Sequence, residues 1–156
     1  MPAKIKYDEK VIARAFRMIE QRAAETIGSY EGTKIHGTHT AKQLAVLDLA
    51  TEEREIFAVA YLTTRHELIE WRRMFYGTIN ACTVHVREVV KHALKVNAAA
   101  VVLAHNHPSG NPDPSPSDEA LTREMATALR VIGVNVLDHV VVAGSCSLSM
   151  AERGLL

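Results

Sequence analysis

The sequence is poor in the features that mark secreted and membrane-spanning proteins. Two cysteines among 156 residues are too few for a disulfide framework or a cysteine-based zinc site. We expect both, Cys82 and Cys146, to be buried free thiols. No apolar run approaches the roughly 20 residues that cross a bilayer, and the N-terminus lacks the apolar core of a signal peptide. These absences predict a soluble, cytoplasmic protein without a membrane partner.

The sequence also lacks an excess of charge of either sign. Eighteen Lys and Arg residues balance eighteen Asp and Glu residues, which is unlike the basic footprint of a dedicated nucleic-acid binder. A local basic patch around Arg65, Arg72 and Arg73 stays open. What is present is a globular balance of 47% hydrophobic and 23% charged residues. That balance and length suit one domain with its own core.

Hydrophobic periodicity divides the chain into two parts. Residues 8–27 carry an apolar stripe at helical spacing that stops at Gly28, and we take residues 1–39 as an N-terminal helical extension. Thr40 and Gln43 fit the capping box of a short helix that ends near Ala50. The remaining pattern predicts strands at 56–63, 68–77, 98–105, 134–144 and 146–150, helices at 84–97 and 116–132, and a helical turn at 151–156. Hairpins and crossovers together predict an α/β fold with a mixed sheet flanked by helices.

The stretch "AHNHPSGNPDPSPSD", residues 104–118, follows a predicted buried strand. His105 and His107 are two residues apart, so strand geometry points both side chains to one face. Two converging imidazoles suit zinc, which binds histidine nitrogen and carboxylate oxygen and keeps one position for water in catalytic sites. Taken alone, the pair is also explained by two polar loop histidines.

The residues after the pair favour a metal. Asp118 falls in the first turn of the next predicted helix, from which its carboxylate would return to the histidines as a third ligand. An ordinary helix start, with Ser115 as N-cap and Pro116 at the first helical position, explains the same residues. It does not explain why they follow His-x-His at a strand end. The prolines and Gly110 restrict the loop, which would hold the ligands in place before metal binds.

These residues carry a family resemblance. The order His-x-His, seven residues, Ser, two residues, Asp matches the JAMM (MPN) metalloprotease motif at His105, His107, Ser115 and Asp118. The stretches "REVVKHALKVNAAA", "GVNVLDHVVVAG" and "LSMAERGLL" further resemble the RadC family. The resemblance covers about residues 40–156 and implies a JAMM/MPN-type (cytidine-deaminase-like) fold. It also implies zinc held by His105, His107 and Asp118.

The resemblance further implies a catalytic glutamate ahead of the first core strand. The sequence offers Glu52, Glu53 and Glu55, and "REIF" matches the RadC-like pattern at Glu55. Glu55 would then act as general base and acid toward a water activated by zinc. Ser115 would donate to the oxyanion of the tetrahedral intermediate. The expected activity is that of a zinc metallopeptidase acting on an amide or isopeptide bond in a substrate of unknown identity.

Other polar residues allow two interpretations each. Ser109 would contact substrate or support the site, or serve only the turn before Gly110. His139 would be a hydrogen-bonded partner of a ligand, or a satisfied core histidine. Trp71 with its neighbouring arginines would mark a partner surface or a strand that faces both ways, and its strand would pair across a homodimer. We expect the remaining histidines, His36, His39, His66, His85 and His92, on the surface or in loops.

The main rival function is a binding module for DNA repair or a mobile element, in which the zinc site is structural or vestigial. The neutral charge does not favour it, and longer RadC-like proteins carry an N-terminal helix-hairpin-helix region that this chain is too short to hold. An HNH nuclease is a poor match, because its named residues are spread over a ββα unit. A zinc deaminase would need His-x-Glu and Pro-Cys-x-x-Cys, which do not occur.

Overall fold

A computed structural model describes residues 14, 18, 25, 28–79 and 81–156. Its elements are α2 (Gly37–Leu49), β1 (Ile56–Leu62), β2 (Leu68–Tyr76), α3 (Val86–Lys95), β3 (Ala100–Asn106), α4 (Pro116–Val131), β4 (Asn135–Ala143) and β5 (Cys146–Ser149). The predicted helix over residues 8–27 lies outside the described residues, apart from isolated positions. The predicted strands and the helices after residue 80 are confirmed to within a few residues at their ends.

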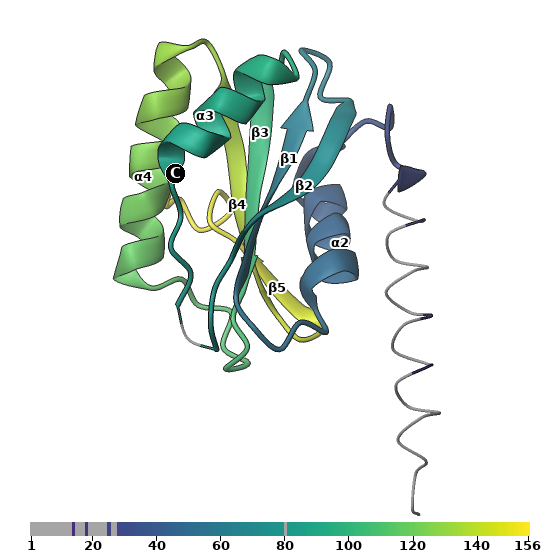
Figure 1. The fold of residues 1–156 in the computed structure, drawn as a ribbon, viewed down its shortest axis with the longest axis vertical. Coiled ribbons are helices and arrows are strands. Elements are labelled where there is room, and N and C mark those ends of the chain that lie inside the picture. Colours follow the sequence, from purple (N-terminus) through teal and green to yellow (C-terminus); the bar gives the residue numbers. More distant parts are fainter. Residues whose placement is uncertain (1–13, 15–17, 19–24, 26–27, 80) are drawn as a thin grey trace, which may run out of the picture.

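The five strands form one sheet in the order β2-β1-β3-β4-β5. β3 and β4 run parallel and are connected through α4, whereas the other neighbouring strands are antiparallel. Figure 1 shows α2 on one face of the sheet and α3 with α4 on the other. The predicted α/β fold with a mixed sheet flanked by helices is therefore confirmed.

The alternation of side chains along the strands builds a core on each face. In β1, for example, Ile56, Ala58 and Ala60 pack with α2, and Phe57 and Val59 pack with residues of α3 and α4. Both β1 and β3 are buried along their whole length, as expected of central strands covered on both faces. The face that carries a side chain of β1 or β3 thus follows from whether its number is odd or even.

The start of α2 differs from the prediction. The helix begins at Gly37, with His36 at the N-cap position and no side-chain cap, so Thr40 lies inside it. The cause is a tertiary contact, because Ile35 is buried and its N–H donates to the carbonyl of His66 at 2.8 Å. The chain then turns at Gly37, whose φ of +71° is left-handed, and the helix starts one turn early.

Three smaller expectations were wrong. Cys146 is exposed and Cys82 half-buried, although both are free. His92 is buried on α3 rather than at the surface, where its ring packs against Tyr61. The tail after β5 forms a hydrogen-bonded turn rather than a helical turn. Within the described residues, no helix has the length and apolar content needed to cross a membrane.

Candidate metal centre

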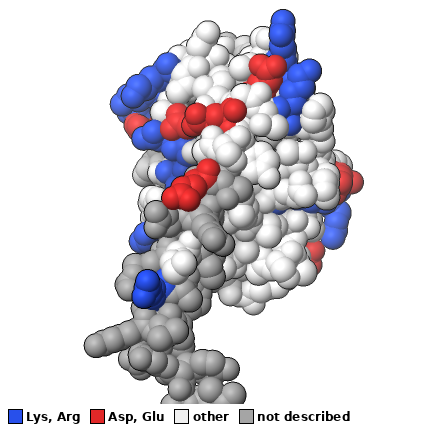
Figure 2. Space-filling view, turned by 90° about the vertical axis from the view of Figure 1, so that its right-hand side faces the viewer, with Lys and Arg blue, Asp and Glu red and all other residues white. Residues whose placement is uncertain are grey.

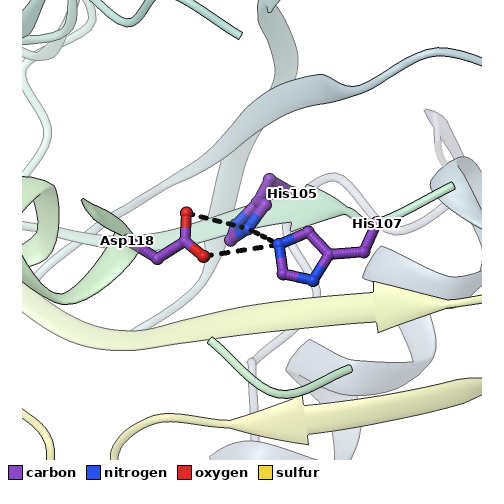
Figure 3. A group of neighbouring side chains, drawn as sticks. All are labelled: His105, His107 and Asp118. Carbon is purple, nitrogen blue, oxygen red and sulfur yellow. Dashed lines mark hydrogen bonds and ion pairs between the residues drawn. The ribbon is translucent and has the colours of Figure 1, made fainter. Parts of the chain in front are cut away.

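Three side chains converge at the end of β3. Nε2 of His105 and Nε2 of His107 lie 2.9 Å apart. Each also lies 3.3 Å from an oxygen of Asp118, His105 from Oδ1 and His107 from Oδ2. Figure 3 shows the carboxylate of Asp118, from the first turn of α4, facing both imidazoles. Within the described residues this is the group of histidine, cysteine and acidic side chains with the geometry to hold a metal ion.

The three side chains are close enough to share one metal ion, since their ligand atoms all lie within 4.8 Å of one another. Ligand atoms at zinc distances of about 2.0–2.1 Å and tetrahedral angles are about 3.3 Å from one another. A direct N–H···O⁻ hydrogen bond between charged partners is shorter, about 2.7–2.9 Å. The two histidine–carboxylate distances of 3.3 Å, which end on different oxygens of Asp118, are close to the former value, and the 2.9 Å between the two Nε2 atoms is shorter. Two nitrogens and a carboxylate also form a donor set that zinc accepts, with the fourth position left for water.

The predicted start of α4 is confirmed and fixes Asp118. Ser115 is the N-cap, Pro116 is at the start of the helix, and Ser115 and Asp118 form a reciprocal capping box. The N–H and the hydroxyl of Ser115 both donate to Oδ2 of Asp118 at 2.7 Å. These bonds aim the carboxylate at the histidines and leave Oδ1 as the oxygen with fewer donors. The helix start and the candidate metal ligand are therefore one structure.

Electrostatics keep the carboxylate of Asp118 ionised. Burial raises the pKa of Asp118, but hydrogen bonds to His105 and His107 outweigh it and hold the pKa well below its usual range. The hydrogen bond with Asp118 raises the pKa of His107, against the lowering effect of burial. An ionised carboxylate beside two imidazoles is the charge state that a divalent cation requires.

The sheet brings Glu55 to the same place from fifty residues away. Phe57 pairs with His105 in the antiparallel register of β1 and β3. Continuing that register by one pair on the same face sets Glu55 opposite His107. Both residues line a cavity of ≈ 590 Å³ together with the rest of the centre. Burial raises the pKa of Glu55, partly opposed by His105 and His107.

The two neighbouring glutamates are placed differently. Glu52 forms an ion pair with Arg73 at 2.8 Å, and Glu53 is exposed. Neither lines the cavity of the centre. Of the three candidate glutamates, Glu55 is the one that lines the cavity of the centre, whereas Glu52 and Glu53 line an adjoining cavity.

Asn106, which sequence reasoning missed, fixes the backbone around Glu55. It points to the opposite face from His105 and His107, where it is buried. Its Oδ1 accepts the N–H of Ile56 at 2.7 Å, and its Nδ2 donates to the carbonyl of Arg54 at 2.9 Å. Asn106 thus holds the residues on both sides of Glu55. The available signal was a polar residue inside an apolar strand, which needs partners when buried.

His139 lies directly behind His105. Its Nε2 is 2.8 Å from Nδ1 of His105, and its Nδ1 is 2.6 Å from Oγ1 of Thr122 on α4. Burial lowers the pKa of His139 well below its usual value, so the ring is neutral. Thr122 was also missed, although it stands one helical turn after Asp118 on the buried side of α4.

Ser109 and the arginine cluster lie further from the ligand atoms. Ser109 is exposed at the rim of the cavity, in a turn that the N–H of Gly110 closes to the carbonyl of His107. Arg73 is bound to Asp48 and Glu52, and Arg72 to Glu70. Trp71 donates its indole N–H to Asp48 at 2.8 Å. On the face seen in Figure 2, basic and acidic side chains lie interspersed.

The fold and the centre together define an α/β domain with a candidate His-His-Asp metal site at the edge of a mixed sheet. Residues 35–155 match the model of the RadC-like JAB domain. The chain is 45% identical over 150 residues to a UPF0758 protein of Vibrio cholerae, covering 96% of this chain and 90% of the relative. It is 43% identical over 149 residues to the UPF0758 protein YkfG of Escherichia coli, covering 96% and 91%.

Some relatives are longer. A UPF0758 protein of Coxiella burnetii is 47% identical over 119 residues, which cover 76% of this chain and 53% of the relative. The family model matches well over half of the chain, and the relatives agree with it. The chain belongs to the RadC-like JAB domain family.

Proposed function

We propose that the protein is a zinc-dependent hydrolase that cleaves an amide or isopeptide bond. The observation that carries the proposal is the convergence of Nε2 of His105, Nε2 of His107 and the carboxylate of Asp118. Glu55 faces the same cavity without being one of those three groups. A three-ligand group with a separate carboxylate beside it has the composition of a catalytic rather than a structural zinc site.

The residues of the chain would divide the work as follows. A bound zinc ion would supply Lewis acidity and lower the pKa of water toward neutrality. Glu55 would accept a proton from that water on a carboxylate oxygen and deliver it to the leaving amine. Its raised pKa favours this cycle, because a base works best when its pKa lies near the working pH.

Ser115 would stabilise the developing oxyanion. Its hydroxyl proton is directed at Oδ2 of Asp118 at 2.7 Å. To donate to an oxyanion, the hydroxyl of Ser115 must therefore turn away from Oδ2 of Asp118. The N–H of Ser115 still donates to that oxygen, so the carboxylate keeps its position. Seven apolar side chains complete the cavity wall beside the reacting groups: Phe57, Ile79, Ala81, Cys82, Val84, Pro108 and Leu121.

The first test is zinc binding by purified protein, measured by elemental analysis and by titration against a competing chelator. We expect about one zinc ion per chain, lost in His107→Ala and kept in the control His85→Ala, whose side chain is exposed. A folded wild-type protein that binds no zinc would overturn the proposal.

The second test concerns the base. Glu55→Gln should retain zinc and lose turnover of peptides selected from an unbiased library, while Glu53→Gln should keep both. Turnover by Glu55→Gln equal to that of the wild type would remove Glu55 from the mechanism.

The rival binding function makes a different prediction. Phosphate contacts made by lysine and arginine weaken steeply as salt rises. The arginines of β2 are held by acidic neighbours, so we expect no binding of duplex DNA even at low salt. Salt-sensitive binding by zinc-loaded protein would favour the rival.

A further inference from the structure

We propose that the backbone of α4 sets the tautomer of His105 through Thr122 and His139, so that His105 presents an unprotonated Nε2 to the metal centre. Thr122 and His139 are then positioning residues that act through His105. The inference deepens the proposed metal site and rests on it. It follows from three short contacts in series, each of which can contain only one proton.

The first contact fixes the hydroxyl of Thr122. Oγ1 lies 2.6 Å from the carbonyl oxygen of Asp118 and 2.6 Å from Nδ1 of His139. A carbonyl oxygen accepts only, so the single hydroxyl proton must lie on the bond to Asp118. Oγ1 is consequently the acceptor toward His139, and Nδ1 of His139 carries a proton.

The second contact determines which ring nitrogen of His105 carries the proton. His139 is fully buried, and its two ring nitrogens meet a hydroxyl and another imidazole. A neutral imidazole has one N–H, which is already on Nδ1. Nε2 of His139 is therefore an acceptor, and Nδ1 of His105, 2.8 Å away, must donate to it.

The third step is the result at the centre. With its proton on Nδ1, His105 has a free lone pair on Nε2, the atom that lies 3.3 Å from Asp118 and 2.9 Å from Nε2 of His107, from which it can accept a hydrogen bond in the metal-free chain. Metal binding needs that lone pair. If these hydrogen bonds were donated in the opposite direction, Oγ1 of Thr122 and the carbonyl oxygen of Asp118 would lie 2.6 Å apart with no proton between them. Two facing acceptors at this distance repel each other, which excludes that direction.

Asp118 enters this arrangement twice. Its side chain faces the histidines as a candidate ligand, and its backbone carbonyl begins the series that orients His105. The first turn of α4 therefore prepares two of the three ligands, one directly and one through β4.

The direct test is long-range proton–nitrogen NMR of the histidine rings in metal-free, full-length protein, which distinguishes the two neutral tautomers. We expect the Nδ1–H form for both His105 and His139. Assignment uses His105→Gln and His139→Gln. An Nε2–H form of either ring in the wild type would overturn the inference, whether or not the variants fold.

The second test is zinc affinity. Removal of an outer hydrogen-bonding partner of a metal-binding histidine typically weakens metal binding by about 10–100-fold. We expect a loss in this range for Thr122→Val, which keeps the side-chain shape but removes the hydroxyl, and recovery in Thr122→Ser. Thr127→Val is the matched control, since Thr127 makes the same kind of bond on α4, to the carbonyl of Arg123 at 2.8 Å, but faces solvent.

The outcomes separate this inference from the proposed function. If the wild type binds no zinc, the proposed function fails, while the NMR result still decides the tautomer. If the wild type binds zinc and Thr122→Val binds it equally well, the positioning role fails and the zinc site stands. The whole inference is supported if the wild type has the Nδ1–H form of His105 and Thr122→Val both loses zinc affinity and shifts His105 toward the Nε2–H form.

Discussion

Histidine meets carboxylate at two places on the same face of the sheet, near opposite ends of β1. At one end, Nε2 of His92 lies 2.8 Å from Oε2 of Glu70, and the other oxygen of Glu70 is 3.0 Å from Arg72. At the other end, His105 and His107 face Asp118 at 3.3 Å. In the first group, both oxygens of Glu70 already have direct hydrogen-bond partners. The second leaves three ligand atoms directed at one point, which is the arrangement a cation completes.

The largest expected difference between the two groups is in zinc binding. Asp118→Asn removes the anionic ligand but keeps an oxygen that accepts from Ser115, so the helix cap loses no more than about 1 kcal/mol. We expect zinc affinity to fall by more than the roughly 100-fold that an outer partner costs. Glu70→Gln should leave it unchanged, as measured by chelator competition. Equal loss in both variants would erase the distinction between the groups.

Metal removal should come next in size. Zinc at about 100 times its dissociation constant would stabilise the folded chain by about 2.7 kcal/mol. A chelator should therefore lower the unfolding temperature by several degrees in the wild type and in His92→Gln. Asp118→Asn should show no such shift, and a chelator effect of full size in Asp118→Asn would place the stabilising metal elsewhere.

Asn106→Leu should separate stability from metal binding. The change leaves the buried N–H of Ile56 and carbonyl of Arg54 without their partner, and an unsatisfied buried group costs about 1–3 kcal/mol. We expect a loss of about 2 kcal/mol in urea unfolding, with zinc affinity nearly unchanged because Asn106 faces away from the ligands. Asn135→Leu, at an exposed strand position, is the control. Unchanged stability would show that Asn106 does not hold this segment.

The smallest expected effect is on how the contact between Glu70 and His92 stabilises the fold as pH changes. Burial raises the pKa of Glu70, but hydrogen bonds from His92 and Arg72 outweigh it and lower the pKa below its ordinary 4.5. The stabilisation is thus fully present above pH 4.5 and is lost as pH falls toward the lowered pKa. Glu70 is partly exposed to solvent, which screens the interaction, so the contact contributes no more than about 1 kcal/mol. Urea unfolding of wild type and Glu70→Gln from pH 7 to pH 3 should show a difference that shrinks below pH 4.5; a constant difference would contradict it.

Local pattern was sufficient for much of the fold and for the proximity of three site residues. Strand periodicity put His105 and His107 on one face, and the cap residues Ser115 and Pro116 located the start of α4. Both depend on neighbours in the sequence, and the structure places them as expected. The predicted start of α2 was wrong because it depends on the hydrogen bond between Ile35 and His66, which joins segments far apart in the sequence.

The supporting residues were harder to predict because their partners come from other elements. Asn106 binds the segment before β1, and Thr122 meets His139 of β4. His92 could have been predicted, since it lies between Val89 and Ala93 on the buried side of α3. Its carboxylate partner on β2 could not, because that contact depends on how α3 packs against the sheet.

The mixed pairing of β3 has a consequence for protein design. Its antiparallel neighbour β1 starts where β3 ends, which delivers Glu55, whereas its parallel neighbour β4 requires a crossover helix whose first turn delivers Asp118. A purely parallel or purely antiparallel sheet would deliver only one of the two at that edge. Transplanting the tripeptide His-Asn-His onto another scaffold would therefore copy two nitrogens and little else. The smallest portable unit is a strand with one neighbour of each orientation and the helix between the parallel pair.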